Sequence, residues 1–130
     1  MRQYVYVRAT AKGGGDIRHF SDVVGKAIEG EIRSLHPCVI PKGDEGLYWC
    51  SHAMPIHDSR PDAVVDTYAI PFRNVMEEIN HRDRFEVSFV IVTEHRHIDE
   101  LCGYYFSPAT IATIASVGWD IDIDVVRQLA

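Results

Sequence analysis

The chain has 130 residues, and its hydrophobic fraction of 46% and charged fraction of 25% are typical of a soluble globular domain with one core. The net charge is −6, and residues 66–130 carry all of the excess, with five arginines, no lysine and eleven acidic residues. An acidic half disfavours nucleic acid as a partner, because binding phosphates needs a basic surface. It permits a basic protein partner, because complementary charge speeds encounter, although simple solubility explains the same excess.

Neither a membrane span nor a disulfide framework is expected. No apolar run approaches the ~20 residues of a transmembrane helix. The first seven residues lack the longer apolar core of a signal peptide. Three cysteines without metal-binding spacing favour reduced thiols: Cys38, Cys50 and Cys102. We therefore expect a cytoplasmic protein with no membrane partner.

The chain should begin with a strand over residues 2–9, because apolar and polar side chains alternate there. Its buried face would carry Val5, Val7 and Ala9. Its opposite face would carry Arg2, Tyr4, Tyr6 and Arg8. After a glycine-rich loop, residues 17–29 are expected to form a helix. The buried stripe of that helix would be Ile17, Phe20, Val24 and Ile28.

The middle of the chain gives weaker patterns. Pro37 and Pro41 argue against a central strand near residues 31–40. A short strand with a tryptophan is expected over residues 47–51. Residues 52–61 are polar and rich in turn formers, which predicts an exposed loop.

Residues 63–70 suit either an edge strand or the first turn of a helix. Pro71 biases Ile70 away from the helical conformation, so a clear helix is expected only from Pro71 onward. Its apolar stripe would be Phe72, Val75, Met76 and Ile79. A strand over residues 84–93 follows, and its second half is apolar on both faces, which is typical of a central strand.

The clearest local pattern is a helix that begins after Ser107. Ser107 is a good N-cap, Pro108 suits the first helical position, and Gly118 can adopt the left-handed conformation that ends a helix. Its expected buried face carries Ile111, Ile114 and Ala115.

The last strand, residues 119–126, alternates strictly between apolar and acidic residues. Its acidic side carries Asp120, Asp122 and Asp124. A strand that is apolar on one face belongs to an antiparallel or mixed sheet covered on one side. The whole pattern predicts a single α+β domain over residues 1–130, with about four to five strands and helices packed on one face of the sheet.

Two segments carry a family resemblance. Residues 103–108 read Gly-Tyr-Tyr-Phe-Ser-Pro and lead into a helix, a Val-Gly pair and an Asp-Ile-Asp-Ile-Asp strand, and Lys42-Gly43-Asp44 is followed by Trp49. This order resembles the bacterial "domain of unknown function 4279" family, from which the chain departs in its long middle, residues 51–70. The resemblance implies a small α+β domain without an established catalytic centre. Some members of that family look like immunity proteins of bacterial toxin systems.

Metal binding and acid–base catalysis are alternatives that the sequence supports less well. Neighbouring aspartates on one strand diverge too much to converge on a cation without help from elsewhere. His95 and His97 have the spacing of a zinc pair on a strand, and His57 beside Asp58 could exchange a proton. No nearby cysteine or HExxH pattern completes the zinc site, although Glu94 and Asp99 could help, and two residues adjacent in sequence rarely have catalytic geometry. We therefore expect no cofactor, no metal and no enzymatic activity.

The predicted function is that of a small cytoplasmic binding protein. If helices cover one face of the sheet, the polar sides of the first and last strands share the other. Tyrosine and arginine are frequent interface anchors, although strands favour tyrosine in any case. We expect an immunity protein that neutralises a basic toxin by direct contact, through Arg2, Tyr4, Tyr6, Arg8, Asp120, Asp122 and Asp124. A small metal- or His/Asp-dependent enzyme and a homodimer that pairs through an exposed sheet edge are the alternatives.

Overall fold

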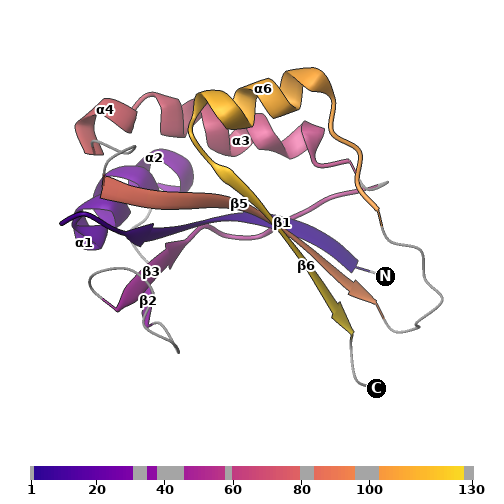
Figure 1. The fold of residues 1–130 in the computed structure, drawn as a ribbon, viewed down its shortest axis with the longest axis horizontal. Helices are drawn as coiled ribbons and strands as arrows, with labels where there is room; N and C mark the ends of the chain where they lie inside the picture. The colour runs from indigo at the N-terminus through magenta and orange to yellow at the C-terminus, as the bar shows by residue number, and fades with distance from the viewer. Residues whose placement is uncertain are drawn as a thin grey trace.

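The computed structural model describes residues 2–30, 35–37, 46–57, 60–79, 84–95 and 103–127. The strands are β1 (Arg2–Ala11), β2 (Leu35–Pro37), β3 (Leu47–Cys50), β4 (Met54–Pro55), β5 (Phe85–His95) and β6 (Asp120–Arg127). The helices are α1 (Ile17–Phe20), the π-helical η1 (Ser21–Gly25), α2 (Lys26–Glu29), α3 (Asp62–Arg73), α4 (Met76–Ile79) and α6 (Pro108–Ser116). The helices lie together on one side of the sheet (Figure 1), which confirms the predicted α+β architecture.

The strands form one mixed sheet in the order β2-β3-β1-β5-β6, and the two-residue β4 also pairs with β1. β5 is antiparallel to β1 and parallel to β6, so the chain crosses over through α6 between β5 and β6. The strands predicted near residues 84–93 and 119–126 therefore lie in the same sheet. β5 sits between two neighbours, which explains why it is apolar on both faces. β2, which contains Pro37, lies at the sheet edge opposite β6, where a proline is tolerated.

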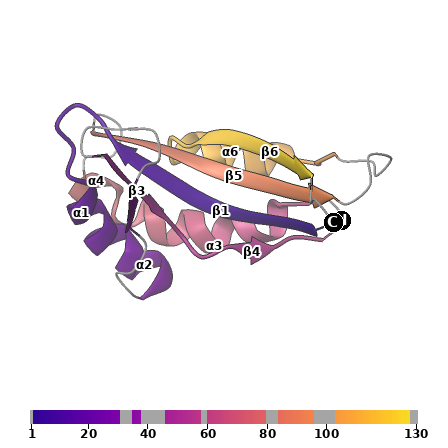
Figure 2. The ribbon, with the colours of Figure 1, turned by 90° about the horizontal axis from the view of Figure 1, so that it is seen from below.

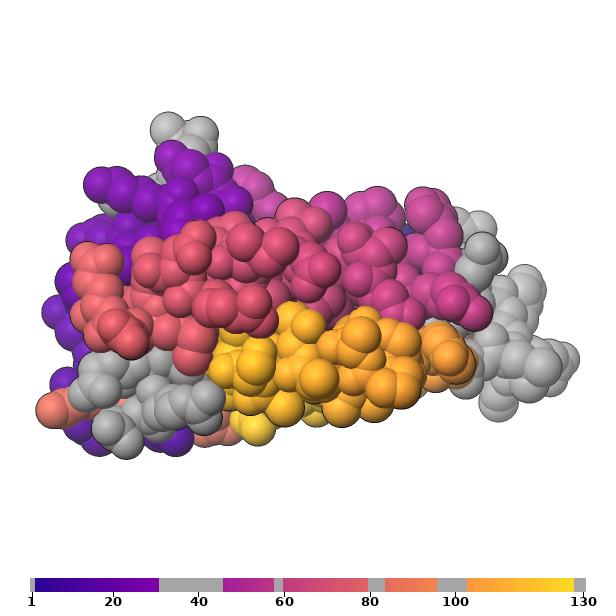
Figure 3. Space-filling model, turned by 90° about the horizontal axis from the view of Figure 1, so that it is seen from above, coloured from indigo at the N-terminus to yellow at the C-terminus, as the bar shows by residue number. Residues whose placement is uncertain are grey.

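The core lies between the sheet and the helices. The side of β1 that faces it is fully buried, as predicted. The expected helix over residues 17–29 forms as one helical stretch whose central turn is π-helical, and Ile17, Phe20 and Val24 are fully buried. Figure 3 shows α3 and α6 side by side over the outer side of this core. None of the described helices is long and apolar enough to cross a membrane.

The helix α3 corrects the prediction for the middle of the chain. It begins at Asp62 and continues through Pro71 to Arg73, so the helical alternative for residues 63–70 is confirmed, whereas the edge-strand alternative and the start of a clear helix at Pro71 were wrong. Burial outweighs the local bias against a helical residue before proline, because three turns of α3 pack on the core through Val65, Tyr68, Ala69 and Phe72. The chain then leaves the helical path at Asn74 and resumes in α4, whose Ile79 is buried as predicted.

The segment before α3 is more ordered than an exposed loop. Met54 and Pro55 pair with β1, and Ile56 is buried against the core at 6% exposure. The histidines on either side of this short strand, His52 and His57, are exposed. The sequence did not predict the burial of Ile56, because one apolar residue in a polar segment gives no periodic signal.

The cap of α6 forms as predicted. The Ser107 Oγ accepts a hydrogen bond from the Thr110 N–H at 3.2 Å, and Gly118 ends the helix with φ of 70°. The buried face differs from the prediction: Thr110, Ile114 and Val117 face inward, whereas Ile111 is 51% exposed. Thr110 tolerates burial because its hydroxyl accepts a hydrogen bond from the Ser107 Oγ at 3.0 Å.

Replacing Ser107 with alanine should lower the free energy of unfolding by about 1 kcal/mol, because the Thr110 N–H loses its acceptor. Ser107→Thr keeps a hydroxyl at the cap and should retain most of the stability. Urea denaturation of the three proteins measures both effects. An equal loss in the alanine and threonine variants would show that packing, and not the cap, determines stability at this position.

Candidate protein-binding surface

The seven residues predicted to bind a partner lie on the same side of the sheet, opposite the helices. We call this side the open face. Pairing with β5 brings its two neighbours, β1 and β6, into register: Val90 lies between Tyr6 of β1 and Asp122 of β6, and Val92 lies between Tyr4 and Asp124. Figure 2 views the molecule from the side opposite α6, with β1, β5 and β6 running alongside one another.

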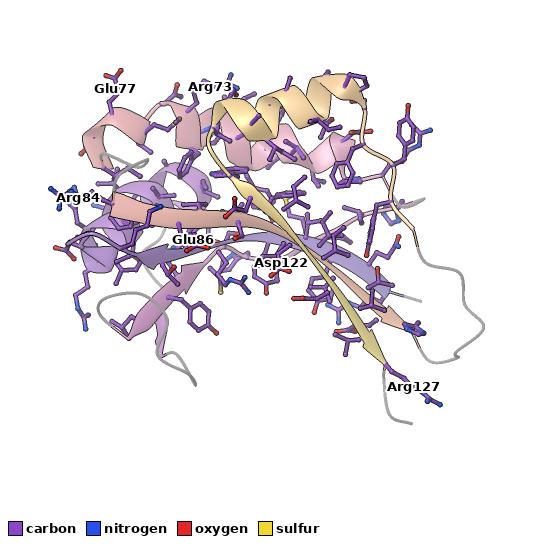
Figure 4. All side chains as sticks on the ribbon, viewed as in Figure 1. Arg73, Glu77, Arg84, Glu86, Asp122 and Arg127 are labelled. Atoms are coloured by element: carbon purple, nitrogen blue, oxygen red, sulfur yellow. The ribbon has the colours of Figure 1, made fainter. Side chains whose placement is uncertain are left out.

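The centre of the open face is an ion pair that spans β5. The Arg8 Nη2 donates a hydrogen bond to the Asp122 Oδ2 at 2.8 Å, although the two residues are 114 positions apart in the sequence. Burial alone would lower the pKa of the Arg8 guanidinium, but the hydrogen bond to Asp122 and nearby acidic groups outweigh it and raise the pKa. The pair is 28% and 37% exposed, and pairs this accessible contribute little to stability. Its main effect is to fix the orientation of both side chains (Figure 4 labels Asp122).

A second polar group occupies one end of the open face. The Tyr4 hydroxyl donates to the Glu94 Oε1 at 3.1 Å, and the Arg2 guanidinium lies 4.8 Å from the centre of the Tyr4 ring. Arg2 also approaches the Glu94 Oε2 at 3.7 Å. Burial and the hydrogen bond to Glu94 raise the pKa of Tyr4, so its hydroxyl stays protonated at neutral pH.

Tyr6 lies between these two groups, over a small apolar layer. Val90 and Val92 of β5 point to the open face, yet they are only 0% and 5% exposed. Side chains of the neighbouring strands, Tyr6 among them, therefore cover the middle of β5. Burial and the charge of Asp124 raise the pKa of Tyr6, which keeps this hydroxyl neutral. The centre of the open face thus offers a neutral aromatic side chain beside a fixed ion pair.

The charge on the open face is predominantly negative. Acidic side chains on it come from two strands: Glu86, Glu94, Asp120, Asp122 and Asp124. The basic side chains that lie among them are Arg2 and Arg8. Within the described ranges, Asp122 and Glu94 pair with these arginines, whereas Asp120 and Asp124 form no ion pair. Glu86 and Glu94 were not predicted, although the alternation of β5 places both on its polar side.

The alternative sites find no support in the described residues. No group of three or more His, Cys, Asp or Glu side chains in this part of the chain is placed to hold a metal ion. His97 and Asp58, which the two alternatives need, lie outside the described residues. Cys50 lies beside Arg8 on the open face, and burial and the charge of Glu29 raise the pKa of its thiol, which makes it a weak nucleophile.

Comparison with protein-family models, with curated proteins and with solved structures gave no match. The resemblance to the family of unknown function therefore stays a prediction. Part of the segment pattern that carries it, Lys42-Gly43-Asp44, lies outside the described residues. The function has to be inferred from the geometry of the open face.

Proposed function

We propose that this chain is a small cytoplasmic binding protein, without enzymatic activity, that holds a basic protein partner against the open face. The observation that carries the proposal is the convergence of Tyr/Arg side chains from β1 and carboxylates from β6 on one side of the sheet. Arg8 and Asp122 contact each other directly across this convergence. A surface prepared in this way suits recognition, because its side chains are ordered before the partner arrives.

The two kinds of side chain have different roles in this proposal. The carboxylates steer a basic partner toward the open face and favour it over acidic competitors. Tyr4 and Tyr6 provide partly buried aromatic area with few rotatable bonds, which is what interface anchors need. A standard interface takes about 800 Å² from each partner, and a domain with 7599 Å² of accessible surface can supply that area.

The narrower proposal is that the partner is a bacterial toxin and that this chain is its immunity protein. An enzyme that acts on a phosphate-rich substrate needs a basic surface at its active site. An acidic cover on that surface would compete directly with the substrate. The family resemblance and the negative open face support this role, and neutralisation would occur by occlusion without any chemical step.

Two charge-reversal variants test the proposal. Asp120→Lys with Asp124→Lys changes two open-face carboxylates that form no ion pair with the described residues. Glu77→Lys with Glu78→Lys makes the same change on α4, in the helical layer (Figure 4 labels Glu77). Affinity capture from the native cell should recover a partner with the wild-type chain and with the α4 variant, but not with the open-face variant.

The captured protein is then expressed in a naive host with and without this chain. Growth should stop with the partner alone and recover when the wild-type chain or the α4 variant is co-expressed. The open-face variant should fail to protect. Capture that survives reversal on the open face would contradict the binding proposal, and a captured partner that is harmless would contradict only the immunity role.

A further inference from the structure

The edge strand β6 carries apolar side chains that remain exposed. Ile121, Ile123, Val125 and Val126 are 41%, 49%, 56% and 45% exposed. The first three lie beside buried residues of β5 on the helix-covered side of the sheet, so alternation alone would place them in the core. They stay exposed because β6 is the outermost strand and runs away from the helix layer after it leaves α6 (Figure 1).

One backbone edge of β6 has no strand partner among the described residues. β6 pairs with β5, and no strand of the described chain pairs with its other edge. Proteins usually protect such an edge with charged side chains, above all lysine, with a proline or with a bulge, because an exposed apolar edge invites pairing with another strand. The 8 residues of β6 contain neither proline nor lysine. An accessible edge of this length, with apolar side chains beside it, has the features of a strand-addition site.

We propose that an extended segment of the partner protein adds to the sheet as a strand along the outer edge of β6. Its apolar residues would pack beside Ile121, Ile123 and Val125, and its basic residues would face Asp120, Asp122 and Asp124. The segment therefore alternates Lys or Arg with apolar residues. This inference rests on the proposed function, because it specifies how the basic partner is held.

The negative charge of β6 favours a basic partner strand over a second copy of this chain. Two copies of β6 paired antiparallel around Ile123 would place Asp122 of one copy opposite Asp124 of the other. Pairing around Asp124 would place that residue opposite itself. Like charges directly opposite each other destabilise a strand pair, whereas opposite charges stabilise it. The aspartate row thus disfavours self-pairing and favours a basic strand.

A synthetic peptide provides the probe. We would use a capped peptide of 8 residues, the length of β6, in which lysine and valine alternate. Two control peptides separate strand addition from simple charge attraction: one has the same composition in block order, and one has N-methylated backbone amides along one edge. The alternating peptide should bind with saturation and should increase protection of β6 amides from hydrogen exchange. Both controls should bind at least about tenfold more weakly, because strand addition needs alternation and main-chain hydrogen bonds.

A matched pair of variants locates the site. Ile123→Lys blunts the edge of β6, whereas Ile111→Lys makes the same change at a similarly exposed isoleucine of α6. The dissociation constant for the alternating peptide should rise at least about tenfold with Ile123→Lys and stay unchanged with Ile111→Lys. Equal binding by all three peptides, or an equal response to both variants, would overturn the inference.

The same variants separate this inference from the proposed function. A natural partner that is lost with the open-face variant but retained by Ile123→Lys would uphold partner binding and overturn strand addition. Loss of the partner with Ile123→Lys, and not with Ile111→Lys, would support strand addition. A wild-type dimer in sedimentation that Ile123→Lys dissociates would also overturn it, because the occupant would then be a second copy.

Discussion

Replacing Phe20 with alanine is expected to lower the free energy of unfolding by about 3–5 kcal/mol, a large part of the stability of a domain this size. Phe20 is fully buried, and its ring centre lies 4.8 Å from that of Phe85, 5.4 Å from Trp49 and 6.2 Å from Phe72. These contacts join the first helical segment to β5, β3 and α3. Truncation would leave a cavity where several elements meet, and rigid strands on one side limit how far the site can collapse.

Ile111→Ala is the control for this prediction, because Ile111 is 51% exposed and shortening it opens no cavity. Its effect should stay within about 0.5 kcal/mol. Urea denaturation followed by near-ultraviolet and far-ultraviolet circular dichroism measures both variants. A loss below about 1 kcal/mol for Phe20→Ala would mean that the neighbouring rings close the gap, and the aromatic cluster would then not be the centre of the core.

The parts of the fold that the sequence predicts well are those where a residue, or a short run of residues, determines the local structure. Alternation in β1 predicted which side chains face the core, because shifting the pairing of the strand by one residue would move all its apolar side chains to the opposite face of the sheet. Ser107 and Gly118 defined α6 for similar reasons, since a cap and a left-handed stop are local requirements. The same alternation placed the tyrosines and the aspartates on the open face once the helices were known to lie on the other side.

The parts that could not be predicted depend on contacts between distant segments. Pro71 lies inside α3 because packing of the helix on the core outweighs a local preference. Ile123 is exposed because β6 lies at the edge of the sheet, and the sequence of a single strand does not predict where that strand lies in the strand order. The Arg8–Asp122 ion pair required both the strand order and the register. Local pattern thus predicted which residues share the open face, but not which of them touch.

Changing Asp120, Asp122 and Asp124 together to asparagine should slow association with the partner that capture from the native cell recovers. Asparagine keeps the shape and the hydrogen-bonding capacity of aspartate but removes three negative charges. Folding should survive, because these side chains lie outside the core and the side chains of the Arg8–Asp122 ion pair are only 28% and 37% exposed but accessible enough to contribute little to stability. Wild-type association should also weaken as salt rises, since screening acts over about 8 Å at physiological ionic strength. Surface kinetics at two salt concentrations measures both effects.

A control with the same charge change elsewhere completes this test. Asp66→Asn, Glu77→Gln and Glu78→Gln remove three exposed carboxylates from α3 and α4, on the helical side of the molecule. A slower association in this control as large as that in the open-face variant would mean that net charge, and not the open face, steers the partner.

Tyr6→Ala should act on dissociation instead of association. Tyr6 is half buried over Val90, so its loss removes packed area at the centre of the open face without changing the net charge. The dissociation rate should rise about tenfold or more, as for other aromatic anchors, while the association rate stays within about threefold of the wild type. If Tyr6→Ala slowed association and left dissociation unchanged, the ring would act in the encounter and not as an anchor. If both rates were unchanged in the tyrosine and the aspartate variants, the open face would not be the binding surface. The edge of β6 would then be the remaining candidate for binding the partner.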